Sequence, residues 1–144
     1  MATILLCTSC TSPPEPVAFT TDGCSRVPDG TPSHRELWKH CCYHHDKAYW
    51  RGGTYEQRRA ADRELRMCIA DVQDPALALM MYEGVRVGGS PWWPTSYRWA
   101  YGWPYGRGYR ELSEAEQRMA DEVLAADEGS DLLRRERAQA DKQD

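Results

Sequence analysis

Apolar and polar residues recur at helical spacing in two consecutive segments of the chain. Residues 33–36 (Ser-His-Arg-Glu) and 54–57 (Thr-Tyr-Glu-Gln) both have the form of a capping box, which predicts that a helix begins at each. The first helix is expected to run to about Trp50, because Gly52 and Gly53 supply a stop signal. Residues three or four apart share one face of each helix: Leu37, Cys41, His45 and Ala48 or Tyr49 on the first, and Ala61, Asp62, Leu65, Cys68 and Ile69 on the second.

The link between these two predicted helices is short, so they should pack antiparallel. If Cys41 bonds Cys68, the small residues Ala48 and Ala61 come to face each other about two turns further along the helix pair, which allows close approach. His45 and Asp62 then lie between the disulfide and this alanine pair, within hydrogen-bonding reach of each other. The register is therefore self-consistent.

Two further helices are expected. Asp74 and Pro75 form a good helix opening, and the short apolar helix that they begin should end near Gly84. A capping box at residues 113–116 opens another helix, whose predicted buried stripe consists of Ala115, Met119, Val123 and Ala126. Beyond Gly129, residues 131–144 mix both charge signs, which predicts a solvated, frayed helix or a disordered tail. The predicted fold class is all-α.

Residues 90–109 form a segment rich in glycine, proline and aromatic side chains. The aromatic residues are Trp92, Trp93, Tyr97, Trp99, Tyr101, Trp103, Tyr105 and Tyr109. One interpretation is a loop wrapped over a small helical core, with the rings supplying buried surface. The other is a hydrophobic rim that inserts at a lipid interface or lines an acyl channel, since tryptophan and tyrosine favour that boundary. The two interpretations can coexist.

Length and charge limit the classes of function. The chain has 144 residues, which suits one domain plus a tail, small enough to benefit from covalent staples. The net charge of -4, with no basic stripe, argues against a nucleic-acid partner. No apolar run approaches the roughly 20 residues that a transmembrane helix requires.

The candidate chemistry is concentrated in residues 41–49, Cys-Cys-Tyr-His-His-Asp-Lys-Ala-Tyr, which Asp62 and Cys68 match on the second helix. This combination resembles the secreted phospholipase A2 superfamily, whose signature is Cys-Cys-x-x-His-Asp-x-Cys-Tyr followed by a helix carrying aspartate and cysteine. Residues 21–29 (Thr-Asp-Gly-Cys-Ser-Arg-Val-Pro-Asp) resemble the calcium loop of the bacterial and fungal branch. The resemblance covers residues 21–69.

The chain departs from that signature at Ala48, where the family has cysteine. In the disulfide-rich branch this cysteine pairs with the residue just before the aspartate of the second helix, which here is Ala61. Both halves of one bridge are therefore replaced together. The two pairings that the resemblance implies for this chain are Cys24–Cys42, which would hold the loop beside the first helix, and Cys41–Cys68, which would join the two helices.

The resemblance also implies catalytic roles. His45 is expected to act as the general base toward water, and Asp62 to orient the imidazole and stabilise the imidazolium. Tyr49 matches the family tyrosine that supports this aspartate by hydrogen bonding. No serine or cysteine nucleophile is needed.

Calcium is the expected cofactor, since it prefers carboxylate and carbonyl oxygens. The expected ligands are the carboxylates of Asp22 and Asp46 and the carbonyl of Gly23, and the ion would stabilise the developing negative charge. The predicted function is calcium-dependent hydrolysis of the sn-2 acyl ester of glycerophospholipids at a membrane interface, by a monomer. Residues 21–128 would form this domain, after an export and linker segment at 1–20 and before a charged tail at 129–144.

Other interpretations stay open. The histidine–aspartate pair could make only surface or capping interactions. Zinc binding is a second alternative, since Cys41 and His45, and also His40 and His44, are four residues apart. Two further classes of function are a non-catalytic phospholipase-fold module of the cell envelope that binds calcium or lipid, and a structural envelope protein that uses its cysteines only as staples.

The disulfides imply an oxidising compartment, so the chain is expected to be exported to the periplasm, to the outer membrane as a lipoprotein, or to the medium. Six cysteines are present, and Cys7 and Cys10 remain outside the two implied bridges. Cys10, followed by Thr11 and Ser12 and a proline-rich linker, resembles a bacterial lipoprotein attachment site, although Cys7 stands where such a site has leucine. A standard signal peptide is not legible in this segment.

Overall fold

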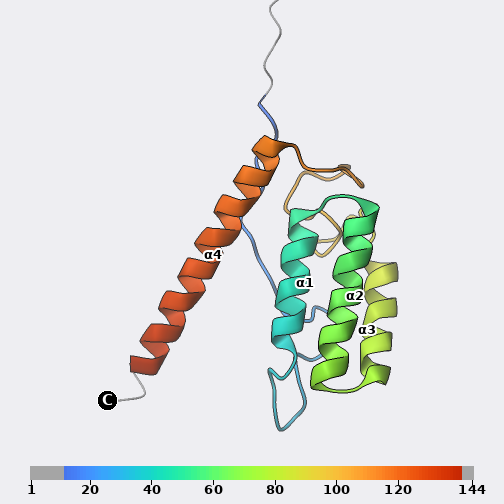
Figure 1. The fold of residues 1–144 in the computed structure, drawn as a ribbon, viewed down its shortest axis with the longest axis vertical. Coiled ribbons are helices and arrows are strands. Elements are labelled where there is room, and N and C mark those ends of the chain that lie inside the picture. Colours follow the sequence, from blue (N-terminus) through green and yellow to red (C-terminus); the bar gives the residue numbers. More distant parts are fainter. Residues whose placement is uncertain (1–11, 141–144) are drawn as a thin grey trace, which may run out of the picture.

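The protein is all-helical in the part of the chain that the computed structural model describes, residues 12–140. Figure 1 shows its four helices: α1 (Lys39–Arg51), α2 (Tyr55–Val72), α3 (Pro75–Gly88) and α4 (Glu114–Ala140). The first three lie side by side, and α4 is inclined to α1 so that its C-terminal end stands away from them. No strand occurs between residues 12 and 140, so the predicted fold class is confirmed. Cys7 and Cys10 lie outside the described residues.

The predicted start of the first helix is wrong. Residues 33–38 form a bend followed by turns, and α1 begins at Lys39 without a side-chain cap. The cause is Trp38, whose backbone N–H donates to Asp29 O (3.0 Å) and whose indole Nε1 donates to Pro28 O (2.7 Å). These contacts fix the preceding residues against the loop, so the local capping pattern at Ser33 is overridden. The predicted stop is confirmed, since Gly52 follows the helix with a positive φ of 72°.

The capping box predicted at residues 54–57 is present. The Thr54 side chain accepts a hydrogen bond from Gln57 N (3.2 Å), and the Thr54 N–H donates to Gln57 Oε1 (2.7 Å). Asp74 caps α3 by accepting from Ala76 N and Leu77 N, as the Asp-Pro opening predicts.

Helix α3 continues to Gly88, beyond its predicted end near Gly84. A glycine inside a helix costs about 1 kcal/mol, which is too little to end a helix whose next turn is held in place. Val85 packs against the core, and its carbonyl accepts a hydrogen bond from Arg58 on α2. Tertiary contacts therefore extend the helix.

Helix α4 begins at the predicted capping box and continues past Gly129. Ser113 and Glu116 exchange the two capping hydrogen bonds, at 2.8 Å and 3.3 Å. The helix then runs through Gly129 to Ala140, so the segment predicted as a frayed helix or tail is helical as far as the structure describes it. Contacts on both sides of the glycine hold it, with Glu128 paired to Lys47 of α1 and Asp131 to Arg135.

Two disulfides cross-link the N-terminal half of the chain. Cys24 bonds Cys42 and Cys41 bonds Cys68, the two pairings that were expected, with Cα–Cα distances of 5.2 Å and 5.7 Å. The first ties residues 21–29 to α1, and the second ties α1 to α2. Closing loops of this length stabilises a fold by about 3 kcal/mol each in the chain-entropy description.

The aromatic segment covers the C-terminal end of α1. The backbone N–H groups of Ala100 and Gly102 donate to Tyr49 O (2.7 Å) and Trp50 O (3.1 Å). The indole of Trp103 donates to Arg51 O (2.8 Å). The last carbonyls of a helix have no partner within the helix, so this segment satisfies groups that burial would otherwise leave unpaired.

The rings of this segment divide into two sets. Trp99 and Trp103 are buried in the second of two core clusters, beside Tyr49, Trp50 and Leu112, as the loop interpretation predicts. Trp92, Trp93 and Tyr105 are more than half exposed. The buried rings form part of the core. Only the exposed rings remain candidates for a hydrophobic rim at a lipid interface. Within residues 12–140, no helix combines the length and the apolar character needed to cross a bilayer.

Glu116 carries a further structural interaction at the start of α4. Its carboxylate is buried and accepts two hydrogen bonds from Arg107, at 2.7 and 2.9 Å, and one from Arg110 at 3.0 Å. The hydrogen bonds from Arg107 outweigh the effect of burial and, with the Ser113 N–H, lower the pKa of Glu116 to about 2. The ion pair between Arg107 and Glu116 attaches the end of the aromatic segment to α4.

We expect Glu116→Gln to lower the free energy of unfolding by about 3 kcal/mol at neutral pH, because it leaves Arg107 buried without its counter-ion. The folded-state pKa lies below the usual value of 4.5, so the stabilisation is fully present above that pH and is lost as the pH falls toward 2. Urea unfolding at pH 7 and pH 3 measures both effects. The exposed Glu122→Gln is the control and should change stability by no more than about 0.5 kcal/mol. Equal stability of the two variants at pH 7 would contradict the assignment.

Candidate active site

His45 and Asp62 meet across the α1–α2 interface, as the sequence predicts. His45 Nε2 lies 2.8 Å from Asp62 Oδ1. Asp62 is completely buried, and His45 is 8% exposed. The Cys41–Cys68 disulfide lies one helical turn before His45 on α1 and about two turns after Asp62 on α2, so it fixes the register that brings the two side chains together.

Two further donors complete the surroundings of the Asp62 carboxylate. Tyr49, also on α1, donates its hydroxyl to the same Oδ1 at 2.7 Å. Arg86, from the last turn of α3, donates Nη1 to Oδ2 at 2.5 Å. Burial alone would raise the pKa of Asp62, but the hydrogen bonds from His45, Arg86 and Tyr49 outweigh it and hold that pKa below its usual value. The carboxylate is therefore ionised and accepts from three helical side chains.

Arg58 links this group to the rest of the fold. It is 2% exposed, and its Nε donates to the Tyr49 hydroxyl at 3.0 Å. Its Nη2 donates to the carbonyls of Val85 and Arg86, both at 2.8 Å, and its Nη1 donates to the Tyr109 hydroxyl at 2.6 Å. A cation at the C-terminal carbonyls of a helix is favourable, so Arg58 anchors the end of α3 beside the histidine–aspartate pair.

Sequence reasoning missed Arg58, Arg86 and Tyr109. Arg58 carried a signal, since it precedes Asp62 by four residues and so shares its helix face. Arg86 and Tyr109 carried none, because only the packing of α3 and of the aromatic segment brings them near α2.

Residues 21–29 lie against the middle of α1 and present a group of acidic side chains there. Thr21 Oγ1 donates to Asp46 Oδ2 at 2.6 Å and accepts from Gly23 N at 3.1 Å. Asp29 Oδ1 accepts from Cys24 N at 2.8 Å. Gly23 has a φ of 75°, and a Cβ there would lie 2.4 Å from Asp29 Oδ1, so only glycine fits this turn.

Negative charge accumulates around Asp46. Burial raises the pKa of Asp46 to about 7, the charges of Asp22 and Asp29 add to this, and the hydrogen bond from Thr21 opposes it. None of the ion pairs formed within residues 12–140 involves these three carboxylates. Asp46 uses Oδ2 for Thr21 and Asp22 uses Oδ1 for Ser25, so each keeps one carboxylate oxygen for another partner. The donor set suits a hard cation.

The side chains of this acidic group do not converge as one complete metal site. Across the described chain, the only three metal-ligating side chains whose atoms lie within 4.8 Å of one another are His40, Cys41 and Cys68. Any cation held by Asp22 and Asp46 would therefore take its remaining ligands from backbone carbonyls, such as that of Gly23, and from water.

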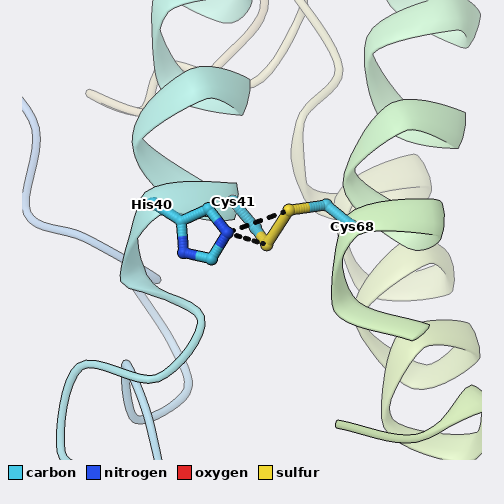
Figure 2. A group of neighbouring side chains, drawn as sticks. All are labelled: His40, Cys41 and Cys68. Atoms are coloured by element: carbon cyan, nitrogen blue, oxygen red, sulfur yellow. Dashed lines mark hydrogen bonds between the residues drawn. A yellow bond between two sulfur atoms is a disulfide. The ribbon is translucent and has the colours of Figure 1, made fainter. Parts of the chain in front are cut away.

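The structure argues against the zinc alternative. Figure 2 shows His40 with its Nε2 directed at the Cys41–Cys68 bridge, 3.5 Å from each sulfur. Zinc binds cysteine as the thiolate, and both sulfurs are consumed by the disulfide. His45, the other member of the predicted pair with Cys41, directs Nε2 to Asp62.

His45 and Asp46 open onto an apolar cavity of about 580 Å³. Its apolar lining comes from the loop, α2, α3 and the aromatic segment: Val27, Leu65, Met80, Met81, Val85, Val87 and Tyr97. The arrangement joins a histidine held by a buried carboxylate, an acidic group for a cation, and an apolar space for a hydrocarbon chain. Such a site can activate water against an ester whose acyl chain fills the cavity.

Comparison with protein-family models, with curated proteins and with solved structures found no match to this chain.

We expect Arg58→Met to lower the free energy of unfolding by about 3–5 kcal/mol, because it removes a buried cation that four acceptors share. Chemical denaturation under non-reducing conditions measures the loss. The adjacent Arg59→Met is the matched control, since Arg59 is exposed, and should stay within about 0.5 kcal/mol of the wild type. If the two variants were equally stable, Arg58 would not anchor α3.

Proposed function

We propose that this protein is a calcium-dependent hydrolase of the phospholipase A2 type, which cleaves the sn-2 acyl ester of glycerophospholipids. The observation that carries the proposal is the His45 imidazole, held through Nε2 by the buried Asp62 at the wall of an apolar cavity and next to Asp46. In this proposal α1 and α2 are the antiparallel, disulfide-linked helices of the fold, and residues 21–29 are its calcium loop.

In the proposed reaction, His45 takes a proton from the attacking water through its other ring nitrogen, Nδ1. Asp62 keeps the imidazole in the tautomer with the proton on Nε2 and stabilises the imidazolium that forms. Tyr49 donates to Asp62 and is itself held by Arg58, so the carboxylate stays oriented. The proton then passes to the leaving alkoxide, and the products are a fatty acid and a lysophospholipid.

Calcium would be held by the carboxylates of Asp22 and Asp46 and by the Gly23 carbonyl. Three observations fit a cation here: the raised pKa of Asp46, one oxygen on each of the two carboxylates without a hydrogen bond from the described residues, and the lack of an ion pair to either carboxylate within the same part of the chain. When bound, such an ion neutralises negative charge that develops on a carbonyl oxygen. The Cys24–Cys42 bridge holds the loop against α1, which keeps Asp22 near Asp46.

The surface around the cavity suits a lipid aggregate. Met80 and Val87 line the cavity and are 56% and 72% exposed, and Trp93 donates its indole to Val87 O and is 54% exposed. We call Met80, Val87 and Trp93 the apolar rim. Exposed apolar residues around a cavity mark interaction surfaces, and tryptophan favours the boundary between lipid and water. The two disulfides accord with an exported protein.

The first test compares variants on mixed phospholipid vesicles, with calcium and with chelator. We expect His45→Asn to abolish fatty-acid release, by a factor of about 10⁴ or more, because the base is lost. Its calcium affinity, measured by calorimetry, should stay within about threefold of the wild type, since asparagine is close in size to part of the imidazole and His45 is not a ligand. Asp46→Asn should lose both turnover and calcium binding, because it removes a ligand carboxylate.

Other outcomes separate the alternatives. Calcium and lipid binding by the wild type, without fatty-acid release, would leave a non-catalytic binding module. Absence of both calcium binding and lipid binding in the wild type would favour a structural protein of the cell envelope. Equal loss of folding in both variants would show that the two residues are structural.

The second test concerns the apolar rim. We expect Trp93→Ser to weaken partitioning onto phosphatidylcholine vesicles about tenfold, because it removes a large apolar side chain from the interface. Hydrolysis of a soluble short-chain phosphatidylcholine should be unchanged, since Trp93 lies outside the cavity lining. Leu132→Ser is the control, as Leu132 is 61% exposed on α4, far along the chain from the rim. Equal vesicle binding by both variants would contradict the proposed role of the apolar rim in binding lipid.

A further inference from the structure

The last turn of α3 contributes a side chain to the histidine–aspartate pair. Arg86 Nη1 reaches Asp62 Oδ2 at 2.5 Å, on the carboxylate oxygen opposite the one that His45 uses. The Arg86 side chain is only 18% exposed. Its Nη2 donates to the Tyr55 hydroxyl at 3.1 Å, and its guanidinium lies 5.4 Å from the centre of the Tyr55 ring. The guanidinium is thus held from two sides.

The two oxygens of Asp62 have unequal support. Oδ1 accepts from His45 and from Tyr49, whereas Arg86 is the one described residue that donates directly to Oδ2, since Arg58 Nε stays 3.9 Å away. The terminal torsion of an aspartate side chain has broad minima. Without Arg86, the carboxylate could turn about its Cβ–Cγ bond to find another donor for Oδ2, and Oδ1 would leave the line of the imidazole N–H.

The position of Arg86 is itself fixed by the fold. Arg58 holds the carbonyls of Val85 and Arg86, so the turn that carries the guanidinium cannot fray without breaking two partly buried hydrogen bonds. The same turn supplies Val85 and Val87 to the wall of the cavity. One segment therefore shapes the apolar space and orients the carboxylate beneath the imidazole.

We propose that Arg86 is a positioning residue, which locks the plane of the Asp62 carboxylate so that Oδ1 stays on the His45 N–H. The inference rests on the proposed hydrolase function for its catalytic consequence, but the geometry that it assigns to Arg86 does not. A planar, two-pronged guanidinium suits the role, because one prong reaches Asp62 while the other is fixed by Tyr55. Lysine, a point charge with one nitrogen, would supply the charge without the second anchor.

The kinetic test uses Arg86→Gln and Arg86→Lys, with Arg63→Gln on the exposed face of α2 as the control. Substrate is a soluble short-chain phosphatidylcholine at saturating calcium. We expect kcat of Arg86→Gln to fall by about ten- to a hundredfold, the range typical of residues that orient a reactive group, while KM changes by less than about threefold. Arg86→Lys should recover part of kcat, and Arg63→Gln should match the wild type.

A second readout is independent of lipid hydrolysis. The proton on His45 Nε2, hydrogen-bonded to a buried carboxylate, should give a downfield resonance in the proton spectrum that His45→Asn removes. We expect this resonance to move upfield or broaden in Arg86→Gln and to be retained in Arg63→Gln. If this resonance changes in Arg86→Gln while neither the wild type nor any variant hydrolyses lipid, the positioning role stands and the proposed function fails.

Two results would overturn the inference. One is an unchanged resonance and unchanged kcat in Arg86→Gln. The other is a loss of kcat that follows only the loss of folded protein, measured by thermal unfolding, with the resonance intact in the folded fraction. In that case Arg86 would serve only to attach α3.

Discussion

The middle of this protein depends on compensating one buried negative charge. Asp62 has no exposed surface, and an ionised carboxylate out of water costs several kcal/mol unless donors surround it. Those donors come from different elements: His45 and Tyr49 from α1, and Arg86 from α3. All of them reach Asp62 only when the three helices are in place. The charge therefore makes the packing of α1, α2 and α3 one interdependent arrangement rather than three separate contacts.

Helical spacing in the sequence predicted which faces of α1 and α2 carry the site. It places Cys41 and His45 on one face of α1 and Asp62 and Cys68 on one face of α2, and these faces meet across the link of three residues when Cys41 bonds Cys68, the pairing that the family resemblance implies. The cap at Thr54 was predictable for the same reason, because its partners lie within one turn. The predicted start at Ser33 failed, since the burial of Trp38 against residues 28 and 29 outweighs a cap worth about 1 kcal/mol.

What the sequence could not reveal are contacts that depend on packing between distant segments. The direction in which α3 leaves α2 decides whether Arg86 faces Asp62 or solvent, and no local pattern encodes it. The same holds for Trp103, whose indole reaches Arg51 O across 52 positions. Its aromatic neighbours predicted burial in general, but not that the segment would supply the carbonyl partners of α1. In each case a side chain from the C-terminal half completes a helix end or a charge that the N-terminal half leaves unsatisfied.

The charges on the two sides of His45 have opposite signs, and helix geometry explains the arrangement. Consecutive residues on a helix project about 100° apart, so His45 faces Asp62 and the arginines while Asp46 faces residues 21–29. On the first side two guanidinium groups accompany one carboxylate. On the second side Asp22, Asp29 and Asp46 gather without an ion pair in the described chain, and the pKa of Asp46 rises to about 7. The Cys24–Cys42 disulfide holds residues 21–29 against α1, and so it holds these like charges near one another against their repulsion. In the proposed function, a cation on the acidic side would offset this repulsion, and the imidazole would then lie between that cation and the carboxylate of Asp62.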